Sequence, residues 1–169
     1  MSTLRSLQRS ALLLGLLAMP AVVGAGEPVS KVCLDDKGAA ELVSLVNGLR
    51  QDRGLGTVSS SSKLTAAAEV QSVHMSQQNQ MGHAGPNGSQ VSDRVEAQGY
   101  TYGVVAENVA AGQRGVEAVM AGWESSSSHL ENMLRPEVVD IGVACLSDED
   151  SEFETWWTMV LAAPLKGGR

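Results

Sequence analysis

The sequence lacks an excess of cationic residues. Its 169 residues include 12 lysines and arginines against 19 aspartates and glutamates, for a net charge of −7. Proteins that bind nucleic acid need a basic surface to neutralise phosphates, and an acidic chain is repelled by anionic lipid. The composition therefore argues against nucleic acid as a partner and against adsorption to anionic membrane surfaces.

Common catalytic motifs are missing as well. The sequence contains no HExxH zinc-protease helix, no GxSxG nucleophile elbow, no phosphate-binding glycine loop and no paired CxxC. It has only two cysteines, Cys33 and Cys145. In an oxidising compartment such a pair has one possible connectivity, and the alternative is two buried thiols. We predict a disulfide, which would leave no cysteine to act as a nucleophile.

The first 25 residues are typical of a secretory signal peptide. Arg5 and Arg9 precede an apolar run over residues 11–23, which small residues follow. The run is short for a membrane span, so we predict cleavage near Ala25 and no transmembrane segment. Cleavage would remove two arginines and no acids, which changes the net charge from −7 to −9. We expect an exported protein, periplasmic or extracellular.

The remaining residues fit one domain with its own core. We predict an N-terminal segment over 26–36, a folded domain over 37–164 and a flexible tail over 165–169. Apolar residues recur at helical spacing in four stretches, which predict helices over 37–53, 63–80, 89–98 and 116–123. Runs rich in β-branched residues predict strands over 104–109, 138–145 and 153–161. Helices that cover a small antiparallel sheet indicate a layered α/β domain.

Two of the three histidines follow breaks in the helical patterns. His83 comes directly after Gly82, which suits a left-handed helix cap, and turn residues follow at 85–88. His129 follows four serines at 125–128. Side chains at such positions can point into a cleft, and a structural role is the alternative. We expect His74, which lies in the middle of a predicted helix, to be structural.

Glu107 lies inside the apolar strand predicted over 104–109. A buried carboxylate needs a partner, which could be a protonated imidazole, a metal ion or backbone N–H groups. The first two would bring His83 or His129 to Glu107. If Glu107 instead faces solvent, the strand is an ordinary alternating one. The candidate catalytic residues are therefore His83, Glu107 and His129.

The same three residues are the predicted metal ligands. Two neutral imidazoles and one carboxylate match a divalent ion of the zinc type and leave positions open for water. Affinity should be modest, because no close pair such as HxxxH preorganises the ligands. The alternative is that Glu107 simply hydrogen-bonds an imidazole, which needs no metal.

In their order, these motifs resemble those of the cysteine-rich secretory protein, antigen 5 and pathogenesis-related superfamily, known as CAP, in its short bacterial form. The likeness spans roughly residues 41–163 and rests on six stretches. These are Val46–Arg50, Met81–Gly88, Ala106–Ala110, Trp123 with His129–Leu134, Asp140–Val143 and Trp156–Val160.

The resemblance implies an α+β fold, a three-layer α-β-α sandwich with a small antiparallel sheet between helices. It also implies a central cleft in which His83, Glu107 and His129 take the histidine and acid positions. The departures from the bacterial pattern are Ser127 and Ser128 for proline and glycine, Leu130 for arginine, and Met159 for glutamine. A second cleft glutamate, found in many eukaryotic members, has no secure match, although Glu124 or Glu131 could approach.

The resemblance does not choose one activity, since members of the superfamily resemble lipid or sterol binders, secreted effectors and proposed proteases. A binding module needs only a shaped cleft with satisfied polar groups. A hydrolase needs a metal-bound water or a base such as the Glu107–His83 pair. A purely structural exported domain is the third reading. We expect a monomeric binding module for a small-molecule, lipid or protein ligand, with a metal- or acid/base-dependent hydrolase as the alternative.

Overall fold

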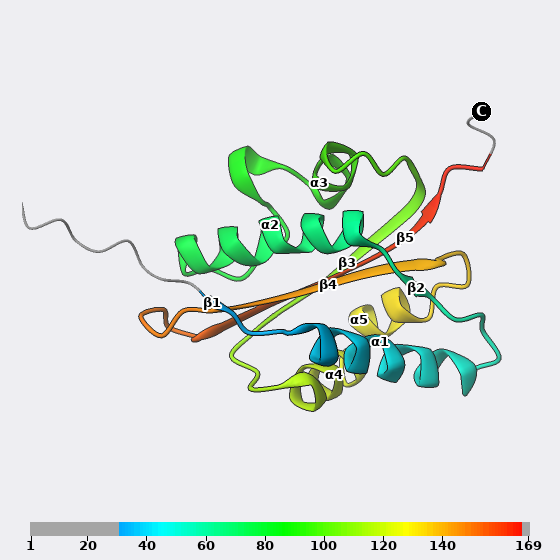
Figure 1. Ribbon diagram of the computed structural model, residues 1–169, viewed down its shortest axis with the longest axis horizontal. Helices are drawn as coiled ribbons and strands as arrows, with labels where there is room; N and C mark the ends of the chain where they lie inside the picture. The colour runs from blue at the N-terminus through cyan, green and yellow to red at the C-terminus, as the bar shows by residue number, and fades with distance from the viewer. Residues whose placement is uncertain (1–30, 167–169) are drawn as a thin grey trace, which may run out of the picture.

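A computed structural model of the chain describes residues 31–166 (Figure 1). The predicted signal peptide and part of the segment 26–36 lie outside the described residues, as does the end of the predicted tail. Within residues 31–166, no helix is long and apolar enough to cross a membrane.

The chain forms five strands, five α-helices and one 3₁₀ turn within the described range. In sequence order they are β1 (Lys31–Val32), α1 (Asp36–Gln51), β2 (Ser59–Ser60), α2 (Ser62–Gln78), η1 (Pro86–Gly88), α3 (Val91–Ala97), β3 (Tyr102–Ala111), α4 (Val116–Glu124), α5 (Ser127–Met133), β4 (Asp140–Ser147) and β5 (Thr155–Pro164).

The strands form one sheet in the order β1-β4-β5-β3, and β2 also pairs with β4. β5 is antiparallel to both of its neighbours, β3 and β4. The central position of β5 explains its run of eight buried residues, 156–163, because a central strand between two helical layers has no solvent-facing side. β3 forms one outer edge of the sheet, while β1 and β2 share the other edge along β4.

Helices cover both faces of the sheet (Figure 1). α2 and α3 pack on one face, where Leu64 and Val95 belong to an apolar cluster that also contains Val160. α1, α4 and α5 pack on the other face, and their cluster includes Val46 and Trp123. The structure is thus the predicted three-layer α-β-α sandwich, in which each helix buries one apolar stripe against the sheet.

Gly142 shows how closely α2 approaches the sheet. A Cβ at this position of β4 would lie 2.1 Å from backbone atoms of Leu64 and Thr65. No side chain fits in that space, so the start of α2 rests directly on the strand. The close packing fixes the position of α2 and of the loop that follows it.

Arg50 joins three segments on the other face. Its side chain is fully buried and donates to the carbonyls of Gly56, Met133, Arg135 and Val138 at 2.7–3.2 Å. Burial lowers the pKa of the guanidinium below its usual range. Because a buried charge must be fully hydrogen-bonded, this one residue holds the end of α1, the loop before β2 and the chain between α5 and β4 in register.

Two sequence predictions differ from the structure near the histidines. The second helix ends at Gln78 with Asn79 as the left-handed cap (φ 49°), so Gly82 is not the cap. Asparagine can take the place of glycine here because it also tolerates this conformation. The serines at 125–128 were predicted only to end a helix, but Ser127–Met133 forms α5, and His129 lies on that helix. The apolar pattern of α5 is too short to show helical periodicity.

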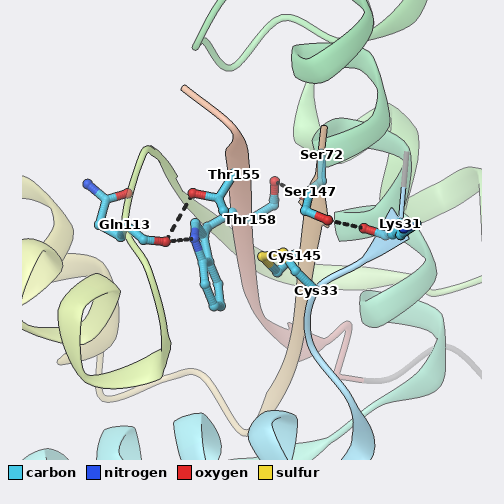
Figure 2. The surroundings of a disulfide bond; sticks show 9 residues. Lys31, Cys33, Ser72, Gln113, Cys145, Ser147, Thr155 and Thr158 are labelled. Atoms are coloured by element: carbon cyan, nitrogen blue, oxygen red, sulfur yellow. Dashed lines mark hydrogen bonds between the residues drawn. A yellow bond between two sulfur atoms is a disulfide. The ribbon is translucent and has the colours of Figure 1, made fainter. Parts of the chain in front are cut away.

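Cys33 and Cys145 form the predicted disulfide (Figure 2). Their Cα atoms lie 5.2 Å apart, and the Cys33 N–H donates to the Cys145 carbonyl at 3.0 Å. The bond therefore continues the β1–β4 pairing and fixes the chain to β4 just before α1 begins. It closes a loop with a sequence separation of 112 residues.

The double variant Cys33→Ala, Cys145→Ala should lower the free energy of unfolding by roughly 2–5 kcal/mol, since a long closed loop restricts the unfolded chain. Urea denaturation followed by circular dichroism measures the change. A reductant should lower the stability of the wild type to that of the double variant and leave the variant unaffected. Equal stability of the oxidised wild type and the variant would contradict the prediction.

Candidate functional site

The candidate site lies on β3, at an outer edge of the sheet. Glu107 and Asn108 are adjacent in this strand and are both buried, with 5% and 0% of their surface exposed. Their side chains alternate between the two faces. Glu107 shares its face with Val105 and Val109 and so lies under the layer of α2 and α3. Asn108 lies on the side of α4 and α5.

Both oxygens of the Glu107 carboxylate are engaged. Oε1 lies 2.9 Å from Nδ1 of His83, and Oε2 accepts from Nη2 of Arg94 at 2.5 Å. The Glu107 and Arg94 side chains are each only 2% exposed, so the pair is a buried ion pair. Of the three kinds of partner considered for Glu107, the structure therefore shows an imidazole. It adds a guanidinium, which was not among them.

Arg94 and Gln71 hold the loop that carries His83. Arg94 Nη1 donates to the carbonyls of Ser89 and His83 at 2.8 and 3.3 Å. From α2, Gln71 Nε2 donates to the carbonyls of Gly82 and Ala84 at 2.6 and 3.3 Å. The backbone on both sides of His83 is therefore bound from two helices, which limits the positions open to the imidazole.

A small residue is required at the centre of this clamp. A Cβ at Gly85 would lie 2.7 Å from Arg94 Nη1 and 2.8 Å from Gln71 Oε1. The position of Arg94 on its helix was a signal in the sequence. Arg94 follows Val91 by three residues and precedes Val95 by one, so it lies on the same helical face as these two apolar residues. A charged residue on an apolar face needs a buried partner.

The two histidines approach the edge of β3 from opposite layers. The His83 side chain remains 58% exposed, and its hydrogen bond with Glu107 raises its pKa despite partial burial and the nearby Arg94. His129 lies on α5, where burial and then repulsion from His83 lower its pKa. The structure therefore brings His83, Glu107 and His129 to one edge but joins only the first two by a direct contact.

Side chains from α4 and α5 occupy the outer edge of β3. Asn132 Nδ2 donates to the Glu107 carbonyl at 3.1 Å and to Asn108 Oδ1 at 2.9 Å. Trp123 Nε1 donates to the Val109 carbonyl at 3.3 Å. The site is thus tied to both helical layers, and these carbonyls are not free to pair with a further strand.

The two glutamates that could have supplied a second cleft carboxylate do not do so. Glu124 and Glu131 are exposed, and neither forms a hydrogen bond or ion pair with His83, Glu107 or His129. Helical geometry explains this, because the buried face of α4 is occupied by Trp123, next to Glu124, and that of α5 by Met133, two residues from Glu131.

A cavity of about 250 Å³ adjoins His129. Apolar groups form most of its wall, including Val109, Ala110 and Trp123, and Ser126 and Gln113 add polar groups. Two of its lining residues, Met81 and Phe153, are among the exposed large apolar side chains of the described range, at 53% and 38%. An apolar hollow therefore lies beside the His129 imidazole, bordered by two large apolar side chains that are partly exposed to water.

The residues do not form the predicted three-ligand metal site as they stand. Both Glu107 oxygens are engaged, and Arg94 places a positive charge beside the carboxylate. Among residues 31–166, no group of three or more histidine, cysteine, aspartate or glutamate side chains is arranged to hold a metal ion. Zinc binding by His83, Glu107 and His129 therefore stays a prediction.

The fold and the site together define a CAP-type domain: an α-β-α sandwich with a histidine–glutamate pair at the edge of its sheet. The sequence profile of the cysteine-rich secretory protein family matches residues 43–161, more than half of the chain. The chain belongs to this family. It is also 32% identical over 103 residues to the uncharacterized protein YkwD of Bacillus subtilis strain 168. That match covers 61% of this chain and 40% of YkwD, so the chain spans less than half of that relative.

Solved structures show the same fold. An outer surface protein of Borrelia burgdorferi matches 80% of this chain and 99% of its own, with 17% identity and a TM-score of 0.72. An extracellular SCP-domain protein of Bacillus anthracis strain Ames matches 76% of this chain and 41% of its own, with 21% identity and a TM-score of 0.67. At these identities the likeness establishes the architecture alone.

The pKa of His83 should fall when Glu107 is replaced by glutamine, because the neutral amide no longer favours the protonated imidazole. In the wild type, a raised pKa means that the pair stabilises the fold at low pH and that this contribution is lost as pH rises through the raised pKa. NMR titration of the His83 ring protons measures the shift. Glu96→Gln, an exposed change on α3, should leave the titration of His83 unaltered. An unchanged pKa of His83 in Glu107→Gln would contradict the prediction.

Proposed function

We propose that the edge of β3 is a ligand-binding cleft and that the protein is an exported binding module. The observation that carries this proposal is the exposed His83 imidazole, held by the buried Glu107–Arg94 pair on β3, together with an apolar cavity of about 250 Å³ that is lined by His129 and by Val109 and Ala110 of the same strand. A polar anchor next to a small apolar hollow is the usual composition of a small-molecule site. The ligand class is a small molecule or side chain that has one apolar group and one hydrogen-bonding group.

His83 is positioned for recognition through its free nitrogen. Nδ1 faces Glu107, so Nε2 is the ring atom left to contact a ligand. With Nδ1–H donating to the carboxylate, Nε2 accepts from a ligand in the neutral ring and donates in the protonated ring. Because Glu107 favours protonation, an acceptor group such as a carboxylate or carbonyl suits His83 at slightly acidic pH.

Hydrolysis is the second candidate, and the contact between His83 and Glu107 favours it. A carboxylate that orients an imidazole is a familiar arrangement for a general base. Glu107 is poorly placed to act as the base, because its side chain is only 2% exposed and is ion-paired with Arg94, so His83 would have to activate a water molecule. Within residues 31–166, no serine, threonine or cysteine side chain is hydrogen-bonded to His83. Binding requires none of these additional groups, and we therefore favour it.

Export is supported by three independent features. The first 25 residues are typical of a signal peptide, and the Cys33–Cys145 disulfide suits an oxidising compartment. Two proteins of similar fold are described as an outer surface protein and as an extracellular protein. The site would then meet ligands outside the cytoplasm.

A small probe with both groups, 4-phenylbutyrate, tests the cleft. NMR titration should shift the signals of His83, His129 and the Trp123 indole together, with saturation in the millimolar range or below. Gly122→Leu should weaken binding at least about tenfold, because Gly122 lines the cavity and a Cβ there meets no atom within 4 Å. Gly48→Leu is the matched control, since this helical glycine in α1 is equally unobstructed. Equal affinities of the two variants would contradict the proposal.

The predicted zinc site has its own test. Calorimetric titration of demetallated protein near neutral pH should give modest, saturable heat that weakens as pH falls, because imidazoles must lose their protons to coordinate. His83→Ala and His129→Ala should each reduce the affinity. No saturable heat in the wild type, or identical heats in all three proteins, would exclude the metal and leave the hydrogen-bonded pair as the whole function of Glu107.

A further inference from the structure

The other outer edge of the sheet, along β4, is paired only at its two ends. β2 pairs with Asp140 and Ile141, and β1 pairs with Leu146 and Ser147. Ser61 N–H donates to the Ile141 carbonyl at 2.8 Å, and Cys33 N–H donates to the Cys145 carbonyl at 3.0 Å. β5 pairs with the inner side of β4 along its whole length, but within the described range no strand pairs with the outer side of β4 between these contacts.

Val143 lies midway along this stretch, and its backbone N–H and C=O point away from β5, toward the unpaired side of β4. In an antiparallel strand, the backbone N–H and C=O of every second residue point to the same side. The carbonyls of Ile141 and Cys145, two residues before and after Val143, accept hydrogen bonds on the side away from β5. The N–H and C=O of Val143 therefore point to that side too. No group among residues 31–166 pairs with the outward N–H and C=O of Val143. The residue is only 5% exposed, and buried backbone groups are almost always paired. A donor and an acceptor here lack their partners.

In the ribbon view, β4 lies between α1 and α2 (Figure 1). Val143 lines a groove whose other lining residues come mainly from these two helices, and we call it the β4 groove. It consists of two adjoining cavities, of about 370 and 480 Å³, that share Asp36, Ala39, Thr65, Glu69 and Val143 as lining residues. Cys145, whose disulfide bond with Cys33 is drawn in Figure 2, also lines the groove. The walls between the charges consist mainly of small and apolar side chains.

The charges of the β4 groove are all of one sign. Asp36 of α1 and Glu69 of α2 are exposed and form no salt bridge with any residue of the described range. No lysine, arginine or histidine of residues 31–166 lines either cavity. A groove with acidic groups on both walls attracts cationic ligands and repels anionic ones.

We propose that the β4 groove docks a short extended peptide segment that carries lysine or arginine. One peptide unit of the segment pairs with the N–H and C=O of Val143, apolar parts contact Ala39 and its neighbours, and the cations lie near Asp36 and Glu69. A free cation would satisfy only the carboxylates, whereas a peptide also supplies the missing donor and acceptor. β1 and β2 occupy the same edge, so about three residues can lie beside β4 before the segment must turn outward.

The β4 groove and the His83–Glu107 cleft lie on opposite edges of the sheet, so the proposal does not depend on the function of the cleft. The probe is the blocked pentapeptide Ac-Lys-Val-Lys-Val-Lys-NH₂. Its acidic counterpart, Ac-Glu-Val-Glu-Val-Glu-NH₂, and a version N-methylated at alternate residues are the comparison peptides. NMR titration and amide hydrogen exchange of the full mature chain report on Val143 directly.

The basic peptide should shift the Val143 amide signal and slow its exchange at least about tenfold at saturation. The acidic and N-methylated peptides should bind at least about tenfold more weakly. Asp36→Asn with Glu69→Gln should reduce the affinity about tenfold, while Glu96→Gln with Glu117→Gln, which removes two exposed acids elsewhere, should not. Ala40→Phe, which fills the groove from an exposed position on α1, should abolish binding.

Three outcomes would overturn the proposal. The first is an unchanged Val143 amide at saturating basic peptide. The second is equal affinity for the basic and acidic peptides. The third is equal loss of affinity in the two double variants, which would show that net charge and not the β4 groove attracts the peptide.

Discussion

A carboxylate buried on an outer strand is the constraint around which the functional end of this protein is built. Glu107 is fixed by β3, and its desolvation is tolerable only because Arg94 and His83 meet its two oxygens. Arg94 must then come from α3, and the loop carrying His83 must lie between α2 and α3. One buried charge thus sets the positions of three segments and leaves one imidazole facing outward.

The two edges of the sheet are protected in different ways, and the difference bears on function. On β3, side chains of Asn132 and Trp123 bind the outward carbonyls, so the edge is closed to a further strand while a cavity remains beside it. On β4, two short strands cover only the ends and leave Val143 between them. Exposed edges invite pairing with other chains. The proposed small-molecule cleft and the proposed peptide groove therefore lie on opposite edges of the sheet.

The engagement of both Glu107 oxygens narrows what the cleft can do. A free carboxylate could act as a base or as a metal ligand, but one held by a guanidinium and an imidazole mainly orients the imidazole. This arrangement favours ligand recognition over catalysis. It also shows how one fold can serve several functions. The fold supplies a positioned histidine, and the surrounding cavity decides what is bound.

The layered architecture could be predicted from the amino-acid order, because apolar periodicity and the succession of family motifs are local properties. The same reasoning identified Glu107 as a residue in need of a partner and Cys33 and Cys145 as a pair. It did not identify Arg94, Gln71 or Asn132 as the groups that complete the site. The place of Arg94 beside two valines on a helix was the one available signal, whereas a glutamine or asparagine on a helix looks the same whether it is buried or solvated. Which atoms face the carboxylate, and which edge groups remain unpaired, became clear only from the folded chain, because those contacts join residues far apart in the sequence.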